Sequence, residues 1–323
     1  MKKITYILIM IGALMIVLAA CSSASSTDKK SEKLTINTTV FPLKSFTEQI
    51  GGKHVEVKSI YPAGTDLHSY EPTQKDLMEA TKADLFIYTG DDLDPVANKV
   101  AKTIKDNDKK LSLQKDLKKS ELLTDQHEHE AHESHDDHHK HEHEEHQHGT
   151  YDPHVWLDPK LNEQFIKSIK EQLIEKDPSH KETYEKNYKK LQADLEQLDQ
   201  QLTKLTKDKQ GKTLYISHES MGYLAERYGF EQKGVQNMSA EDPSQKDLTN
   251  MVKAINKANV KYILYEDNVS TKVTDTIRKE TDAKPVKFYN MESLNKQQEQ
   301  DNKVTYQQLM NKNIKNIEKA LSY

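Results

Sequence analysis

The sequence is nearly free of cysteine, and this absence limits how the protein can hold a metal ion. Cys21 is the only cysteine in 323 residues, so no disulfide can form within the chain. Zinc sites built from several thiolates are excluded for the same reason. Any ion that is held firmly must therefore be bound by histidine, aspartate or glutamate side chains.

Long apolar runs and an excess of positive charge are also lacking. After the run that ends at Ala20, no segment approaches the roughly 20 apolar residues that a membrane-spanning helix requires. The formal net charge is −5, which gives no sign of the basic surface typical of nucleic-acid-binding proteins. We therefore expect no nucleic-acid partner.

The N-terminus has the features of a secretory signal, because two lysines precede an apolar run. The segment LAAC that ends at Cys21 resembles the lipobox of bacterial lipoproteins, which implies cleavage before Cys21 and a diacylglyceryl group on its sulfur. A transmembrane anchor is the alternative, but the run is slightly short for one. We expect a signal peptide at 1–20, a lipidated tether at 21–33 and attachment to the cell membrane on its extracellular or periplasmic side.

What the sequence has in excess is histidine, gathered in a His-rich tract at residues 125–148. Ten of the fifteen histidines lie there, interleaved with nine carboxylates. Both side chains bind divalent metals, and no glycine or proline fixes a geometry, so we expect a disordered insertion with many weak metal sites. A charged solubilising linker is the alternative. The histidines of this auxiliary site are His127, His129, His132, His135, His138, His139, His141, His143, His146 and His148.

Short β-branched or aromatic runs alternate with longer amphipathic stretches, which is the pattern of an α/β protein with mostly parallel sheets. The mature chain exceeds what one core usually fills, so we expect an N-terminal lobe at 34–176 and a C-terminal lobe at 211–323. The expected strands are Leu34–Phe41, Val55–Tyr61, Asp84–Thr89, Lys110–Leu113, Thr213–Ser217, Gly234–Gln236, Tyr262–Tyr265 and Pro285–Tyr289.

Between the lobes, residues 177–210 contain no glycine and predict a long rigid linking helix. Asp158-Pro159 and Asp177-Pro178 each place a capping carboxylate before a proline, so we expect a helix to start at each. From Tyr184 to Leu205, apolar residues recur alternately four and three apart. A coiled-coil dimer would show this spacing too, but three heptads are short for one, and we expect an interlobe strut in a monomer.

Five histidines remain outside the tract, and His68, His154 and His218 lie in loops that follow expected strands or open helices. Such loops lie at the carboxyl ends of strands, where open α/β sheets bind ligands. These three are the candidate metal ligands. The other two, His54 and His180, are expected at the surface.

Each of the three positions also has an ordinary explanation. His68 fits a surface loop. The only tryptophan, Trp156, is expected to pack behind His154, which also fits a core histidine that binds nothing. Ser217 would cap the helix that follows, with His218 beside it by chance.

Three imidazoles leave a zinc ion one ligand short of a tetrahedral shell. Because no thiol is available, the fourth ligand must be an oxygen. Glu292, three residues past the last expected strand, is the best placed carboxylate, while Glu266 and Glu219 are weaker candidates. For Glu292, an ordinary surface acid is the alternative.

Four segments in this order resemble the zinc-binding solute-binding lipoproteins of bacterial ABC importers, a metal-specific cluster whose members are sometimes labelled adhesins. The segments are GTDLHSYEPT, YDPHVWLDP, ISHESMGYLAERYG and YILYEDNVSTKV, with the His-rich tract between the first two. The resemblance implies Zn²⁺ as cargo, His68, His154 and His218 as imidazole ligands, and Glu292 as the carboxylate. It also implies two lobes joined by a long helix, with the metal between them, and a permease and its ATPase as partners. Leu67 departs from the proline or acid common at its position.

Three nitrogens and one oxygen favour zinc over manganese, because the manganese receptors of this family replace one histidine with a carboxylate. We expect the tract to collect zinc and pass it to the four-ligand site, with two ligands from each lobe. A zinc hydrolase is one rival, but no His-Glu-x-x-His motif occurs and a fourth protein ligand would close the shell. We therefore expect no enzyme. An adhesin with a structural metal is the second rival, and it would unfold on chelation.

Overall fold

The structure of the protein is a computed structural model that describes residues 33–124, 151–266, 272–301 and 303–323. The expected signal peptide, Cys21 with almost all of its tether, and the His-rich tract lie outside these described residues. Within them, no helix combines the length and the apolar character needed to cross a bilayer.

The first sheet has four strands in the order β2-β1-β3-β4, and every neighbouring pair is parallel. All four residues of β3 are buried, as expected for a parallel strand that is covered on both faces. The elements of this lobe are β1 (Leu34–Thr38), α2 (Phe41–Gly51), β2 (Val55–Ser59), α3 (Gln74–Lys82), β3 (Leu85–Tyr88), α4 (Pro95–Thr103), β4 (Lys110–Ser112) and α5 (Pro159–Lys176).

The second sheet repeats this design with the order β6-β5-β7-β8, again entirely parallel. Its elements are β5 (Thr213–His218), α7 (Gly222–Tyr228), β6 (Glu231–Gln236), α8 (Gln245–Ala258), β7 (Tyr262–Glu266), α9 (Lys272–Lys279), β8 (Lys284–Phe288), α10 (Lys296–Glu299) and α11 (Tyr306–Ala320). All of the expected strands are present, and β6 begins three residues earlier than expected. The fold class of two parallel sheets flanked by helices is confirmed.

Short 3-10 helices complete the described chain, and they lie mainly in the connections between strands and helices. They are η1 (Gly52–His54), η2 (Asn107–Lys109), η3 (Leu113–Asp116), η4 (Lys119–Glu121), η6 (Val155–Leu157) and η7 (Pro178–His180).

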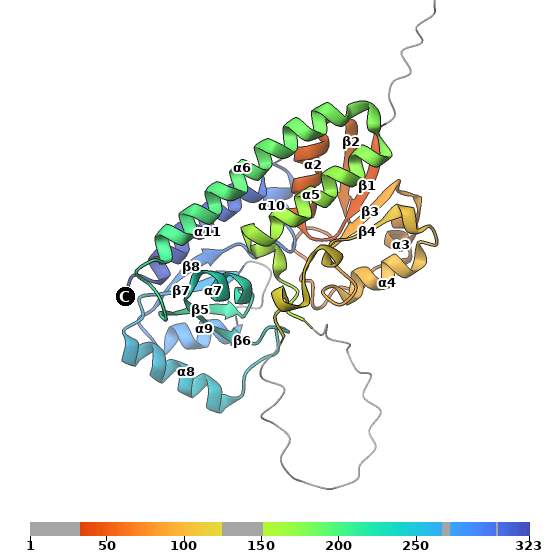
Figure 1. Cartoon of the computed structure of the whole chain (residues 1–323). Helices are drawn as coiled ribbons and strands as arrows, with labels where there is room; N and C mark the ends of the chain where they lie inside the picture. Colours follow the sequence, from red (N-terminus) through yellow and green to blue (C-terminus); the bar gives the residue numbers. More distant parts are fainter. Residues whose placement is uncertain (1–32, 125–150, 267–271, 302) are drawn as a thin grey trace, which may run out of the picture. The chain divides into compact units, whose positions relative to one another are not determined.

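The expected long helix is α6 (Lys181–Thr206), whose 26 residues span about 39 Å at 1.5 Å per residue. Its stripe of Leu191, Leu195, Leu198 and Leu202 is buried against other parts of the same chain. The helix packs on α2, α5 and α11, and Figure 1 shows it running beside α5. The apolar stripe is therefore used within the chain and is not free to form a coiled-coil dimer.

Of the two capping carboxylates expected at helix starts, Asp158 and Asp177, only the first caps its helix. Asp158 accepts a hydrogen bond from a backbone amide in the first turn of α5, as expected. A helical segment does begin at Pro178, as the 3-10 helix η7, and α6 follows from Lys181; the expected cap is wrong, because the Asp177 side chain accepts no backbone amide there. The Asp177 carboxylate instead accepts hydrogen bonds from the Tyr184 hydroxyl and lies 2.5 Å from the His180 ring.

His54 and His180 are partly exposed, in keeping with the expected surface position, but they also contact each other. Their rings stack with centroids 3.5 Å apart. Their neighbours in the sequence, glycine and lysine, indicated solvent. The stack forms because the turn before β2 meets the start of α6, a contact between distant segments that local sequence does not reveal.

The chain returns to the first lobe after β8. Helix α11 packs against β7 and β8 and also against α2 and α6. The main hydrophobic core accordingly includes residues from both sheets, and a smaller core lies beneath α8 and α9. The two lobes are thus tied by α6, by α11 and by the connection between β8 and α10.

Replacing Leu195 with alanine should lower the free energy of unfolding by about 2–5 kcal/mol, because the leucine is fully buried and its loss leaves a cavity. Urea denaturation of the metal-free protein, followed by circular dichroism, measures the change. Lys189→Ala is the matched control on the exposed face of the same helix and should cost less than about 0.5 kcal/mol. Equal effects of the two changes would contradict the packing of α6.

Candidate metal site

His68 lies between β2 and α3 on a loop that is held at both ends. Gly64 adopts a φ of +80°, which favours glycine, and its amide donates to the carbonyl of Leu294 at 2.8 Å. The amide of His68 donates to Oδ1 of Asp66 at 2.9 Å. Thr73 then caps α3. The imidazole is therefore carried by a turn with a fixed backbone rather than by an open surface loop.

His154 is oriented from two sides. Oδ1 of Asp152 accepts the His154 amide at 2.9 Å and lies 2.7 Å from the ring Nδ1, which fixes the orientation of the imidazole. The ring of Trp156 packs edge-on, with centroids 5.4 Å apart. The indole Nε1 donates to the carbonyl of Asn290 at 2.6 Å. Trp156 thus packs behind the histidine as expected, and His154 has no exposed surface.

His218 is the last residue of β5 and is also fully buried. Its Nδ1 lies 3.3 Å from Oε2 of Glu266, and its Nε2 lies 3.1 Å from the carbonyl of Met238. The Glu266 carboxylate accepts hydrogen bonds from the hydroxyls of Ser217 at 3.0 Å and Ser220 at 2.6 Å. Ser217 therefore supports the carboxylate behind His218 and does not cap α7, whose start has no side-chain cap.

Glu292 follows β8 and is held by its own loop. Its Oε2 accepts the amide of Leu67 at 2.9 Å, and its Oε1 accepts Nδ2 of Asn290 at 3.1 Å. The intervening Met291 has a φ of +63°, a left-handed conformation that costs a non-glycine residue about 1 kcal/mol or more. The carboxylate is 1% exposed, so the alternative of an ordinary surface acid is wrong.

Further hydrogen bonds tie this loop to the first lobe. The carbonyl of Glu292 accepts the amide of Phe41 at 3.1 Å, and the Ser293 hydroxyl donates to the carbonyl of Thr65 at 2.8 Å. The hydrogen bonds from the Gly64 amide to Leu294 and from the Trp156 indole to Asn290 add to these. By sequence Glu292 belongs to the second lobe, but its backbone is fastened to the first. The division of two ligands from each lobe, expected from sequence order, therefore does not describe how the site is held.

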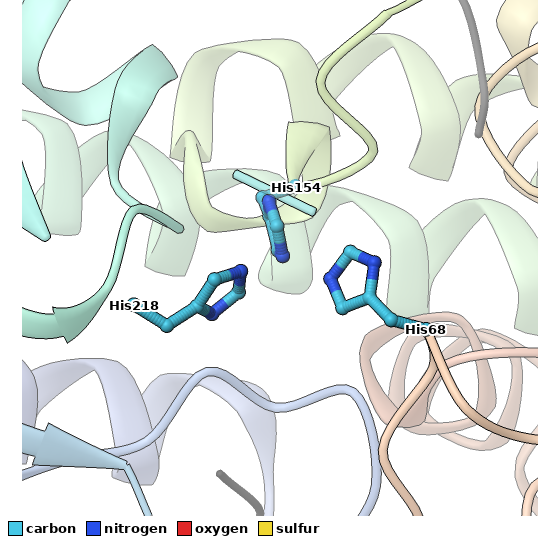
Figure 2. Close-up of side chains that lie close together, drawn as sticks. All are labelled: His68, His154 and His218. Atoms are coloured by element: carbon cyan, nitrogen blue, oxygen red, sulfur yellow. The ribbon is translucent and has the colours of Figure 1, made fainter. Parts of the chain in front are cut away.

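The three histidines, which come from distant parts of the chain, meet at one point. One ligand nitrogen from each of His68, His154 and His218 lies within 4.8 Å of the others. Figure 2 shows the three rings facing one another, with centroids 4.8–5.5 Å apart. Glu292 adjoins them, with its Oε1 3.6 Å from Nε2 of His154. The four side chains singled out from sequence are thus brought together.

The two other carboxylates that were considered take different places. Glu266 lies behind His218, where it orients the ring. Oε1 of Glu219 accepts the amide of Gly234 at 3.0 Å, on the strand beside β5. The carboxylate that faces His154 is therefore that of Glu292. Leu67 supplies no carboxylate, as expected, but its amide holds the carboxylate of Glu292.

Charge at the site is balanced by groups of opposite sign. Burial would raise the pKa of Glu292, but the hydrogen bond with His154 and the charges of the three histidines lower it to about 2. Burial would lower the pKa of His154, but Asp152 and Glu292 outweigh it and raise the pKa to about 10. The pKa of His218 is raised by Glu266 in spite of burial. In the absence of a metal, the site thus holds an ionised carboxylate beside protonated imidazole.

A second group overlaps the first. One ligand atom from each of Asp66, His68 and Glu292 lies within 4.8 Å of the others. Sequence reasoning missed Asp66, although it stands two residues before His68 as Asp152 stands before His154. A small cavity of about 80 Å³ is lined by His68, Leu93, Met238 and others, and of this group only His68 reaches it.

Comparison with known proteins agrees with the resemblance noted in the sequence. A family model described as zinc-uptake complex component A, periplasmic (ZnuA), matches residues 36–320. The high-affinity zinc uptake system protein ZnuA of Bacillus subtilis (strain 168) is 34% identical over 319 residues, which is 97% of each chain.

A second relative, AdcA, and a solved structure of one of its domains come from Streptococcus pneumoniae. The zinc-binding lipoprotein AdcA of strain R6 is 31% identical over 323 residues, and the match covers 99% of this chain but 61% of AdcA. The crystal structure of the Zn(II)-bound ZnuA-like domain of AdcA is 27% identical and superposes with a TM-score of 0.71. That match covers 90% of this chain and 100% of the domain. The chain therefore belongs to the ZnuA family of zinc-uptake proteins.

Proposed function

We propose that the protein captures one Zn²⁺ ion between its lobes and delivers it to the permease of an ABC importer. The observation that carries this proposal is the convergence of three imidazoles and the ionised carboxylate of Glu292 in a largely buried site. Relatives named as zinc uptake and zinc-binding proteins support the identity of the ion. Zinc is the cargo in this scheme, and the protein performs no chemistry on it.

The donor set favours zinc among the divalent metals. Imidazole suits zinc and its neighbours, whereas manganese prefers a shell richer in oxygen. Three nitrogens from His68, His154 and His218 with one oxygen from Glu292 complete the tetrahedron that zinc prefers. Such a closed shell leaves no position for the water that a zinc hydrolase activates, which agrees with membership of a transport family rather than an enzyme family.

The rest of the proposed cycle concerns attachment and supply. A lipid on Cys21 would hold the protein at the outer face of the membrane, within reach of the permease and its ATPase. The histidines of the His-rich tract would collect zinc with low affinity beside the site. The protein would act as a monomer, since the stripe on α6 is already buried within the chain.

Replacing Glu292 with glutamine should weaken zinc binding by roughly 100-fold or more, because the amide keeps the shape but loses the charge. Glu266→Gln should cost less, within the roughly 10- to 100-fold typical of a group that orients a metal ligand. Competition with a zinc chelator at equilibrium measures both dissociation constants. Glu299→Gln, a half-exposed residue that pairs with Lys44 away from the site, should leave the dissociation constant unchanged.

The reverse order, with Glu266→Gln the more damaging, would transfer the role of fourth ligand to Glu266. Tight zinc binding by the Glu292→Gln protein would favour the hydrolase, in which this carboxylate serves only as a base. Complete and irreversible unfolding on chelation would favour an adhesin with a structural metal, whereas a carrier should stay folded when empty and reload.

Zinc affinity should increase as the pH rises from 6 towards 9. The pKa of His154 in the metal-free protein is about 10, so this ring binds a proton at neutral pH and must release it to bind zinc. Each proton released adds about one factor of ten in affinity per pH unit. Titration calorimetry in buffers with different heats of ionisation counts the protons, and we expect at least one at pH 7.5. A count of zero would contradict the protonated state of His154.

Replacing residues 125–148 with a short glycine-serine linker should leave the zinc dissociation constant unchanged and slow loading at low zinc concentration. The chain leaves and returns at one place, since the amide of Asp152 donates to the carbonyl of Leu123 at 2.7 Å, so a short linker spans the gap. Stopped-flow mixing measures loading, and chelator competition measures affinity. Loss of tight binding would show that the tract is part of the site itself.

A further inference from the structure

The buried site raises the question of how a hydrated cation reaches it. His154 and His218 have no exposed surface, and Glu292 is 1% exposed. Of the side chains in the two overlapping ligand groups, only Asp66 and His68 are partly exposed. An ion that approaches from solvent therefore meets these two residues before it meets the others.

Asp66 is placed to bind the ion at that point. A carboxylate oxygen of Asp66 lies within 4.8 Å of ligand atoms of both His68 and Glu292. Asp66 is not part of the cluster that His68 forms with His154 and His218. The arrangement offers two carboxylates and one imidazole, a donor set that accepts a divalent cation still carrying water. On the other side of His68, a cavity of about 80 Å³ that Asp66 and Glu292 do not line has room for water at about 30 Å³ per molecule.

A comparison with Asp152 separates this role from a purely structural one. Both aspartates accept the amide of the histidine two residues later, at 2.9 Å in each case. Asp152 also contacts the ring of its own histidine at 2.7 Å, so its carboxylate serves to orient His154. The Asp66 carboxylate instead has an oxygen within 4.8 Å of a carboxylate oxygen of Glu292. Two carboxylates held this close repel each other unless a cation lies between them.

We propose that Asp66, His68 and Glu292 form an outer docking position that a zinc ion occupies on its way to and from the three imidazoles. The inference rests on the proposed function. Because His68 and Glu292 belong to both positions, the ion moves inward by exchanging Asp66 and its remaining water for His154 and His218. It is never released from the protein during the step, which lowers the barrier in both directions.

The test is Asp66→Asn in the full chain, because asparagine keeps the acceptor for the His68 amide while removing the charge and the ligand. Stopped-flow mixing with zinc measures association, and mixing the loaded protein with excess chelator measures dissociation. We expect the association and dissociation rates both to fall by roughly 10-fold, which is the lower end of the effect typical of losing a group beside a metal ligand. The dissociation constant should change by less than about 3-fold, because both rates fall together. Asp66→Ser, which also keeps a turn-forming oxygen, should show the same pattern.

Two control variants distinguish a role of Asp66 in binding the ion from a general charge effect and from a structural role. Glu71→Gln removes the same charge from an exposed position on the same loop and should change neither rate. Asp152→Asn, the structural counterpart, should speed dissociation and weaken affinity.

If both Asp66 variants behave like the Asp152 variant, Asp66 only shapes its loop and the inference is wrong. Slower association with unchanged dissociation would reduce Asp66 to electrostatic attraction and would also overturn it. Failure of the unaltered protein to bind zinc would overturn the proposed function instead.

Discussion

The site depends on keeping the buried carboxylate of Glu292 ionised, and one donor to it is the amide of Leu67, 225 positions away in the chain. A buried carboxylate is several kcal/mol less stable than a solvated one unless charges and donors surround it. Here the amide, the side chain of Asn290 and the ring of His154 supply them. The left-handed conformation of Met291 follows from this requirement, because the loop must turn sharply to bring the acid inward.

The same local hydrogen-bonded turn positions three of the four side chains of the proposed site. Asp66, Asp152 and Asn290 each accept the amide of the residue two positions later, which is His68, His154 or Glu292 respectively. This turn fixes the backbone of the residue that points into the site. His218 is held differently, since the end of β5 places its backbone and Glu266 from β7 orients its ring.

Much of this architecture could be predicted from sequence because the relevant signals are local. The strands are short β-branched runs, so their positions and the loops that carry His68, His154 and His218 followed directly. The paired aspartates two residues before His68 and His154 were also visible, and the recurrence of that spacing could have identified Asp66. Asp158 was predicted as a cap because a cap depends only on adjacent residues.

The features that sequence did not reveal depend on contacts between distant segments. Glu266 was considered as a ligand, but only the pairing of β5 with β7 puts it behind His218. The stacking of His54 on His180 requires the turn before β2 to meet the start of α6. Glu292 was assigned to the second lobe by its position in the chain, whereas the bonds of its loop to Phe41 and Thr65 became visible only in three dimensions.

In the proposed zinc site, the fastening of the Glu292 loop to the first lobe means that the four ligands are not held equally. His68, His154 and Glu292 share one connected framework, and His218 alone comes from the second sheet, at the carboxyl end of its inner strand β5. A small outward displacement of β5 would convert a closed four-coordinate zinc into a three-coordinate one with a vacancy that water can fill. Zinc in such an open shell exchanges its ligands far more readily. Unloading would then begin at a single imidazole, and a membrane partner would need to shift only the carboxyl end of β5.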